Sequence, residues 1–387
     1  SSDLNSNRQA SVALKEIGNN TSFTLNLKNY GNEEITYSIP EVKVYSEVTD
    51  EVGYIHEVEL EGASITFDKS SVTVPANGTA TVICNLNLSS VVTAQKFVEG
   101  FVKFVGNENV PSLVMPFMGF YGDWSAEKIV DDPEYTDGST SSITAETALI
   151  GVSGENLSYI GAVSNGQYTV FDKSKMAFSP NNDGTLDEVM PYLYMLRNSK
   201  ELKIQVLDQN GDILSEIYKE NNVRKNLLEE YINGTSGPKL VSEGAWDGTL
   251  YNMNTGRYEN VEDGNYYIRV VNKVDLPNAT PQNLDMPIMV DTVAPEIDIL
   301  GVESIASDNN SVNYVLKWKS NDEASGLSDI FVVIIGDKML VLSEDNISKD
   351  SNGNYYAIIP FALETTNDVV VATMDNAGKI GRASCRE

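Results

Sequence analysis

Apolar side chains recur at every second position in short runs along the whole chain. In SFTLNLKN, Phe23, Leu25 and Leu27 alternate with polar residues. This two-residue period is that of a strand with one face buried and the other in water. Turn markers such as PANG at 75–78 separate the runs at intervals typical of a β-sandwich. We therefore expect an all-β protein.

The chain is too long for one ordinary sandwich, because its 387 residues suggest about two or three domains. Alternation fades in one polar segment, which we interpret as a linker or surface loop. A second boundary falls at Pro295, which restricts Ala294 and removes a ladder donor. The expected divisions are a first sandwich at 1–124, a linker or loop at 125–146, a second sandwich at 147–294 and a third at 295–379.

One stretch of the second sandwich, ILSEIYKENNVRKNLLEEYI at 213–232, has a different period. Its apolar residues fall at roughly helical spacings, and Asn221 and Asn222 interrupt the run. We expect a short helix there, within an insertion that decorates the second sandwich.

The last eight residues, IGRASCRE at 380–387, match the translation of a common sequencing adapter. We expect read-through contamination, with the natural chain continuing beyond Lys379. The alternative is a genuine tail, and the nucleotide record distinguishes the two.

The formal net charge of −29 argues against phosphate backbones and anionic lipid as partners. No apolar run approaches the ~18 residues of a membrane span, so we expect neither nucleic-acid binding nor membrane insertion in this segment. Two cysteines, Cys84 and Cys385, cannot form a disulfide framework. Cys84 shares its side of a strand with Val82 and Leu86 and is interpreted as a core residue.

The sequence contains few of the residues and motifs that catalysis requires. The chain has one histidine, His56, and no serine or cysteine flanks it in a recognisable motif. Nucleophile elbows, phosphate loops and HExxH pairs do not occur. We expect no self-contained enzyme. Trp124, Trp246 and Trp318 could stack on sugars, but we expect them to fill cores.

The stretch FSPNNDGTLDE at 178–188 offers closely spaced oxygen donors, the ligands that Ca²⁺ prefers. With Gly184 at the sixth place of an EF-type loop, donors fall at places one, three, five, seven and nine. These candidate ligands are Ser179, Asn181, Asp183, the carbonyl of Thr185, and Asp187. The sequence predicts a structural calcium site here.

Two departures weaken the calcium match. Ser179 stands where an acid is usual, and Met190 stands where a bidentate Glu is usual. Glu188, or Asp247 from another strand, would have to complete the shell. The alternative is an Asn-Asp-Gly turn held by its own side-chain hydrogen bonds, and both interpretations remain open at this point.

Several motifs in order resemble the region after the catalytic domain of cell-envelope subtilisin-like serine peptidases, the family of the lactocepins and the complement-cleaving surface peptidases. The resemblance is carried by VTVPANGTATVICNLNLS, VPSLVMPFMGFYGDW, AFSPNNDGTLDEV, GAWDGT, MVDTVAPEI, DEASGLSDI and ATMDNAGKI. It implies three fibronectin-III-like (immunoglobulin-like) sandwiches in series, and calcium loops within reach.

The resemblance also implies a function. The parent would be a subtilisin-like serine endopeptidase, extracellular and attached to the wall or surface of a Gram-positive bacterium. This chain would be its non-catalytic accessory region, a spacer, stabiliser and docking platform for protein substrates, acting as a monomer beside its own N-terminal protease domain. The alternative is a stand-alone adhesin or carbohydrate-binding β-sandwich array.

Overall fold

A computed structural model describes residues 10–50, 54–133, 146–164, 169–227, 233–234, 237–276, 278–306, 312–361 and 368–386. Strands dominate these ranges, which confirms the all-β prediction. The helical elements described are three single 3-10 turns: η1 (Lys173–Lys175), η2 (Ser242–Gly244) and η3 (Glu344–Asn346). The chain divides into two compact units, 1–127 and 128–387.

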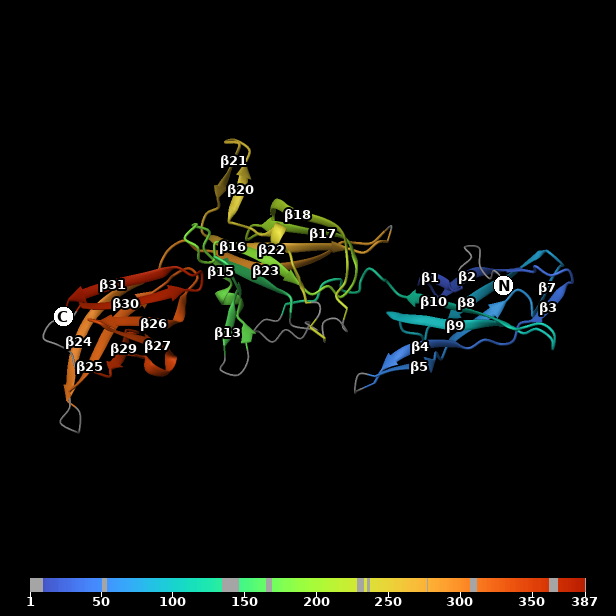
Figure 1. The fold of residues 1–387 in the computed structure, drawn as a ribbon, viewed down its shortest axis with the longest axis horizontal. Helices are drawn as coiled ribbons and strands as arrows, with labels where there is room; N and C mark the ends of the chain where they lie inside the picture. The colour runs from blue at the N-terminus through green and yellow to red at the C-terminus, as the bar shows by residue number, and fades with distance from the viewer. Residues whose placement is uncertain are drawn as a thin grey trace. The chain divides into compact units, whose positions relative to one another are not determined.

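Within its described residues, the first unit holds ten strands in a five-stranded, a three-stranded and a two-stranded sheet, ordered β1-β10-β9-β4-β5, β2-β8-β6 and β3-β7. They are blue to teal in Figure 1. Their bounds are β1 (Val12–Ile17), β2 (Asn20–Lys28), β3 (Ile35–Ser38), β4 (Val44–Thr49), β5 (Ile55–Glu59), β6 (Ala63–Phe67), β7 (Ser71–Val74), β8 (Thr79–Leu88), β9 (Lys96–Phe104) and β10 (Leu113–Tyr121).

The core of this unit follows the alternation of its strands. Leu25 of β2 lies opposite Val82 of β8, and both are fully buried. Cys84 lies in the same core, as its strand pattern predicts. Burial raises the pKa of its thiol to about 12, so Cys84 is a small core residue and not a nucleophile.

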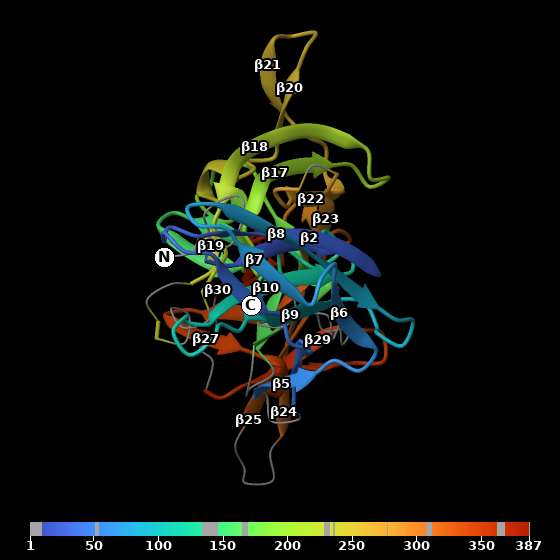
Figure 2. The same ribbon diagram turned by 90° about the vertical axis from the view of Figure 1, so that its right-hand side faces the viewer.

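The second unit begins with the second sandwich, whose larger sheets are ordered β12-β11-β16-β19 and β15-β23-β22-β17-β18. Two hairpins, β13-β14 and β20-β21, accompany them, and Figure 2 shows β20-β21 projecting beyond β18. The bounds are β11 (Ala148–Ser153), β12 (Asn156–Tyr159), β13 (Ala162–Ser164), β14 (Thr169–Phe171), β15 (Ala177–Phe178), β16 (Glu188–Leu193), β17 (Ser199–Leu207), β18 (Ile213–Val223), β19 (Lys239–Leu240), β20 (Thr249–Asn252), β21 (Arg257–Asn260), β22 (Gly264–Lys273) and β23 (Gln282–Val290).

The third sandwich follows in the same unit, with sheets ordered β24-β25-β29-β28 and β27-β26-β30-β31. Trp318 fills its core against Phe331, with ring centroids 5.2 Å apart. Its strands, orange to red in Figure 1, are β24 (Glu296–Ala306), β25 (Val312–Asn321), β26 (Leu327–Ile335), β27 (Lys338–Leu342), β28 (Ser348–Lys349), β29 (Tyr355–Ile359), β30 (Asp368–Asp375) and β31 (Ile380–Arg386).

The helix expected within 213–232 is wrong for the part that the structure describes. Residues 213–223 form β18, which pairs antiparallel with β17 from Ser199↔Val223 to Leu207↔Ile213. Pairing along a whole neighbouring strand outweighs the weak helical spacing of a few side chains, because tertiary context overrides local propensity. Residues 228–232, the end of the expected helix, lie outside the described ranges.

Two other expected segments are placed only in part. Ile129 and Val130, at the start of the expected linker, join the core of the second sandwich, and 134–145 lie outside the described residues. Residues 380–386, the expected adapter tail, form the edge strand β31 beside β30. That these residues come from a sequencing adapter stays a prediction, which the nucleotide record would test.

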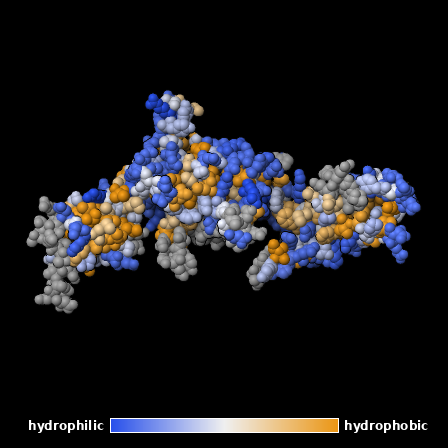
Figure 3. Space-filling view, viewed as in Figure 1, coloured by the Kyte–Doolittle hydropathy of each residue, from blue (hydrophilic) through white to orange (hydrophobic). Residues whose placement is uncertain are grey.

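The surface is mixed, with hydrophobic side chains lying between hydrophilic ones on the visible faces (Figure 3). Within the ranges given above, no helix is both long and apolar enough to span a bilayer.

Candidate calcium loop and the junction of the C-terminal sandwiches

The candidate calcium loop, residues 178–188, connects β15 to β16 in the second sandwich. It closes on itself because the Ser179 amide donates to the Leu186 carbonyl at 2.9 Å. Gly184 has φ 91°, a left-handed conformation in which glycine carries no steric penalty. Leu186 has φ 50°, a left-handed conformation that is sterically unfavourable for a residue with a Cβ. Contacts from the surrounding structure must therefore hold the loop in this conformation.

The polar side chains of the loop largely bond the loop itself. Asn181 Oδ1 accepts from the Asp183 amide at 3.1 Å, and Asp183 Oδ1 accepts from the Thr185 amide at 2.9 Å. Asp187 Oδ2 accepts from the Gly184 amide at 2.7 Å. These bonds are the ones that a side-chain-stabilised turn requires.

Two oxygens of the predicted calcium ligands remain without a hydrogen-bond partner. They are Ser179 Oγ and Asp187 Oδ1, and both are buried. A cation or a water would satisfy them. Asp247, the expected outside ligand, directs Oδ1 to the Thr249 amide and hydroxyl, at 3.0 and 2.7 Å. Calcium in this loop therefore stays a prediction.

The candidate calcium loop also contacts the third sandwich. Lys379 follows the turn after β30, and its Nζ lies 2.8 Å from Asp183 Oδ2. Its hydrogen bond is the main cause that holds the pKa of Asp183 below the usual value. Gly378 packs so closely that an added Cβ would lie 2.9 Å from Thr185 Cγ2. The loop thus forms part of the junction between the second and third sandwiches.

A second connection at this junction runs through the segment VDTVAPE. The Asp291 amide donates to the carbonyl of Phe178 at 3.1 Å, where the loop begins. The Asp291 carboxylate accepts from the Ser325 amide of the third sandwich at 3.0 Å. Asp291 therefore bonds to both sandwiches.

Sequence reasoning missed one group at this junction. Asp291, Asp322 and Asp375 each offer a carboxylate oxygen, and these oxygens lie within 4.8 Å of one another. The three come from separate segments, so no local spacing indicates them. MVDTVAPEI contributed the boundary at Pro295 to the sequence prediction, and it shared the family resemblance with DEASGLSDI and ATMDNAGKI. None of the three fragments was interpreted as a metal site.

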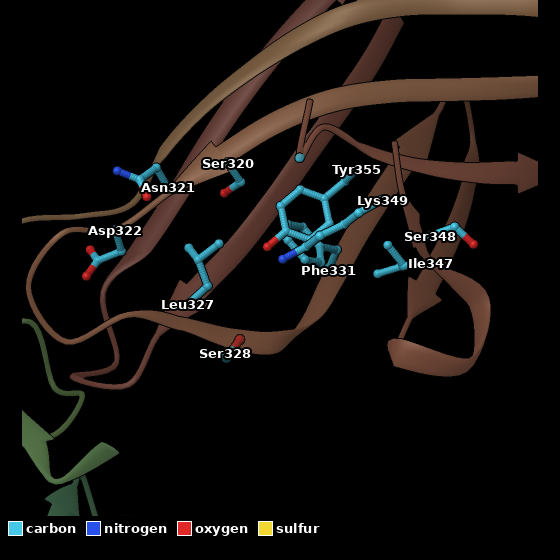
Figure 4. Close-up of a pocket in the computed structure, with 11 residues that line it drawn as sticks. Ser320, Asn321, Asp322, Leu327, Ser328, Phe331, Ile347, Ser348, Lys349 and Tyr355 are labelled. Carbon is cyan, nitrogen blue, oxygen red and sulfur yellow. The ribbon is translucent and has the colours of Figure 1, made fainter. Parts of the chain in front are cut away.

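A pocket of about 700 Å³ opens on the third sandwich. Figure 4 shows the rings of Tyr355 and Phe331 side by side in it, with Lys349 against Tyr355. The Lys349 ammonium lies 4.5 Å from the centre of the Tyr355 ring. Asp322 lies at another side of the pocket. The pocket thus presents aromatic rings and one ammonium group.

His56, the one histidine, lies on β5 with Nε2 2.7 Å from Asp50 Oδ2. It stands on an exposed strand, as expected for a surface residue. Trp246 and Trp318 are core residues, as predicted. Trp124, also expected in a core, is only half-buried and packs edge-on against Phe120, with ring centroids 4.6 Å apart.

Comparisons with known proteins agree with this architecture. Residues 12–118 match the family model of the Fn3-like domain. The PI-type proteinase of Lactococcus lactis subsp. cremoris is 29% identical over 332 residues, which cover 83% of this chain and 17% of the proteinase. The C5a peptidase of Streptococcus pyogenes serotype M3 is 25% identical over 365 residues, covering 75% of this chain and 30% of the peptidase.

Among solved structures, the fibronectin(III)-like modules of Clostridium thermocellum CbhA align over 55% of this chain and 87% of theirs, with 10% identity and a TM-score of 0.30. That similarity is too low to support any argument. The chain spans about a sixth of the length of the lactococcal relatives it matches, at 17%. It therefore carries an Fn3-like domain and is a homologue of the cell-envelope proteinases of lactococci and of the C5a peptidases, the subtilisin-like family that its motifs resemble.

Proposed function

We propose that this chain is a non-catalytic accessory region of a subtilisin-like serine endopeptidase that is secreted and attached to the cell wall of a Gram-positive bacterium. Its role is that of a spacer and stabiliser, with surfaces that dock protein substrates. It acts as a monomer and beside its own N-terminal protease domain. Support comes from the similarity to proteinases over 83% of the chain.

The junction between the second and third sandwiches is the observation that carries the spacer role. Lys379 reaches back to Asp183 across it, and Asp291 bonds to Phe178 on one side and to Ser325 on the other. Such contacts fix the angle between two sandwiches, where a free linker would leave them to move. A spacer that sets the distance and angle of a protease needs this property.

Structural calcium in the candidate calcium loop belongs to the same proposal. The buried and unpartnered oxygens of Ser179 and Asp187 support it. Asn181, Asp183 and the Thr185 carbonyl would complete the ligands, but Asp183 already has Lys379 as a counter-ion. Binding would stiffen the loop that supports the junction.

Substrate docking is proposed at the pocket that Tyr355, Phe331 and Lys349 line. These residues lie on β26, β28 and β29, where the aromatic rings form an apolar wall with an ammonium group beside it. A photo-crosslinker at Lys349 in the complete parent protease should capture casein during turnover. Equal capture from the exposed Lys338, on the same sandwich, would contradict docking at this pocket.

The accessory role is tested directly by activity. The purified chain should release no fluorescence from labelled casein, with or without a serine-protease inhibitor. Inhibitor-sensitive hydrolysis by the pure chain would overturn the proposal. The gene upstream of Ser1 should encode a subtilisin domain, whereas a signal peptide leading straight into SSDLN would favour the adhesin alternative.

A further inference from the structure

Three aspartates from three segments meet at the base of the third sandwich, a group named here the junction triad. Asp291 lies between β23 and β24, Asp322 follows β25, and Asp375 ends β30. One carboxylate oxygen from each lies within 4.8 Å of the others. At such distances three negative charges repel one another strongly unless a cation lies among them.

Burial makes this repulsion costly. Asp291 is 0% exposed and Asp375 is 1% exposed. Carboxylates are almost never buried to this degree without a partner. Asp375 Oδ2 is enclosed and has no hydrogen-bond donor, and the hydroxyl of the neighbouring Ser325 is also buried without a partner. Asp375 of the triad and the adjoining Ser325 therefore each contain one oxygen atom that a ligand must satisfy.

Backbone amides hold the three carboxylates in place. Asp291 accepts from the Val293 and Ser325 amides, each at 3.0 Å. Asp322 Oδ1 accepts from the Gly326 amide at 2.7 Å. Asp375 Oδ1 accepts from the Lys379 amide at 2.8 Å, which leaves its other oxygen unbonded. The donors thus orient the side chains before any ion arrives.

Within the described ranges, no lysine or arginine side chain forms an ion pair with the triad. Lys379, the nearest basic residue in sequence to Asp375, directs Nζ to Asp183 instead. Burial, together with the charges of Asp291 and Asp322, raises the pKa of Asp375 to about 7.

The chemistry of the ligands selects the ion. All are hard oxygens, without histidine or cysteine, which favours Ca²⁺ or Mg²⁺ over zinc and copper. Ca²⁺ takes six to eight oxygens in flexible geometry, whereas Mg²⁺ demands an octahedron and keeps several waters. A site built from loops and a linker, with the unbonded hydroxyl of Ser325 next to Asp291, suits Ca²⁺ better.

We propose that Asp291, Asp322 and Asp375 bind one Ca²⁺ ion. The ion ties the linker to two loops of the third sandwich, and through the Asp291–Phe178 bond it also ties the third sandwich to the second. This site is separate from the candidate calcium loop, and it is independent of any role in a protease. Because its ligands come together only in the folded chain, Ca²⁺ must raise the stability of the fold.

The test uses the purified full chain after chelation, with Ca²⁺ added back and melting followed by calorimetry. Millimolar Ca²⁺ should raise the melting temperature of the wild type by several degrees. Asp375→Asn should lose the part of this rise that the triad contributes, and keep only what calcium in the candidate calcium loop contributes. Without calcium, Asp375→Asn should melt no lower than the wild type, because it removes a buried charge. Asp337→Asn, in an exposed turn of the same sandwich, should behave as the wild type.

Each other outcome has a definite meaning. No rise in the wild type would overturn the proposal. A rise kept in Asp375→Asn and lost in Asp183→Asn would move the ion to the candidate calcium loop and also overturn it. An equal rise with Mg²⁺ would refute the choice of calcium. If Asp375→Asn fails to fold, Asp322→Asn serves, since Asp322 is only half-buried; titration calorimetry should then show one Ca²⁺ fewer per chain.

Discussion

Gly378 offers a sharp test of the junction between the second and third sandwiches. It has φ 87°, and an added Cβ would lie 2.9 Å from Thr185 Cγ2 and 3.3 Å from Leu186 Cδ1. Gly353 is a matched control in the same sandwich. It has φ 80°, and nothing lies within 4 Å of its added Cβ. Both amides donate to an aspartate carbonyl three residues earlier.

The magnitudes follow from these two environments. Each substitution by alanine places a Cβ in the left-handed region, which costs about 1–2 kcal/mol. Gly378→Ala must in addition push Thr185 and Leu186 away, and overpacking of this kind costs about 1–3 kcal/mol. We expect Gly353→Ala to lose about 1–2 kcal/mol and Gly378→Ala about 2–5 kcal/mol.

Urea unfolding followed by circular dichroism measures the difference between the two variants. Thr185→Ala removes the methyl group that the new Cβ of Gly378→Ala would strike, so it should restore part of the stability of Gly378→Ala and none of that of Gly353→Ala. Equal losses in the two glycine variants, together with no rescue by Thr185→Ala, would show that the candidate calcium loop does not pack on the third sandwich in solution.

Three further predictions concern the cores and the charges. Cys84 should resist alkylation at about pH 8 in the folded chain and react after unfolding, because burial raises its pKa to about 12; mass spectrometry measures the label. Trp246→Ala should cost about 3–5 kcal/mol in urea unfolding, since it empties the core of the second sandwich and removes the bond from Nε1 to the Thr249 carbonyl. Ser174 and Asn354 hold the pKa values of Asp172 and Asp350 below the usual 3.8. In acid the unfolded chain therefore binds more protons than the folded one. The stability that these two carboxylates contribute is present above pH 3.8 and is lost as the pH falls through their lower folded pKa values. The melting temperature should fall between about pH 5 and about pH 3, and it should fall less steeply with pH in Asp350→Asn.

The strands were predictable because their signal is local. Leu25 and Leu27 are buried while Thr24 is exposed, as a two-residue period requires when one face meets a core. The same rule placed Cys84 in the core of the first unit. Each of these outcomes depends on a few adjacent residues, so the sequence carries enough information for it.

The errors lie where distant segments decide. Residues 213–223 have some helical spacing, but β17 offers them a whole strand to pair with, and that partner is not visible in the local pattern. The junction triad was missed for the same reason: Asp291, Asp322 and Asp375 become neighbours only when a linker and two loops meet. The donors of the candidate calcium loop were found because they are contiguous.

The two bonds of Asp291 have a consequence for how such domains are exchanged between proteins. Its amide donates a hydrogen bond to the second sandwich, and its carboxylate accepts one from a loop of the third. A crossover placed between Val290 and Pro295 would put Phe178 and Ser325, the two partners of Asp291, in domains from different proteins. Gene shuffling, natural or engineered, should therefore move the second and third sandwiches together as a single cassette.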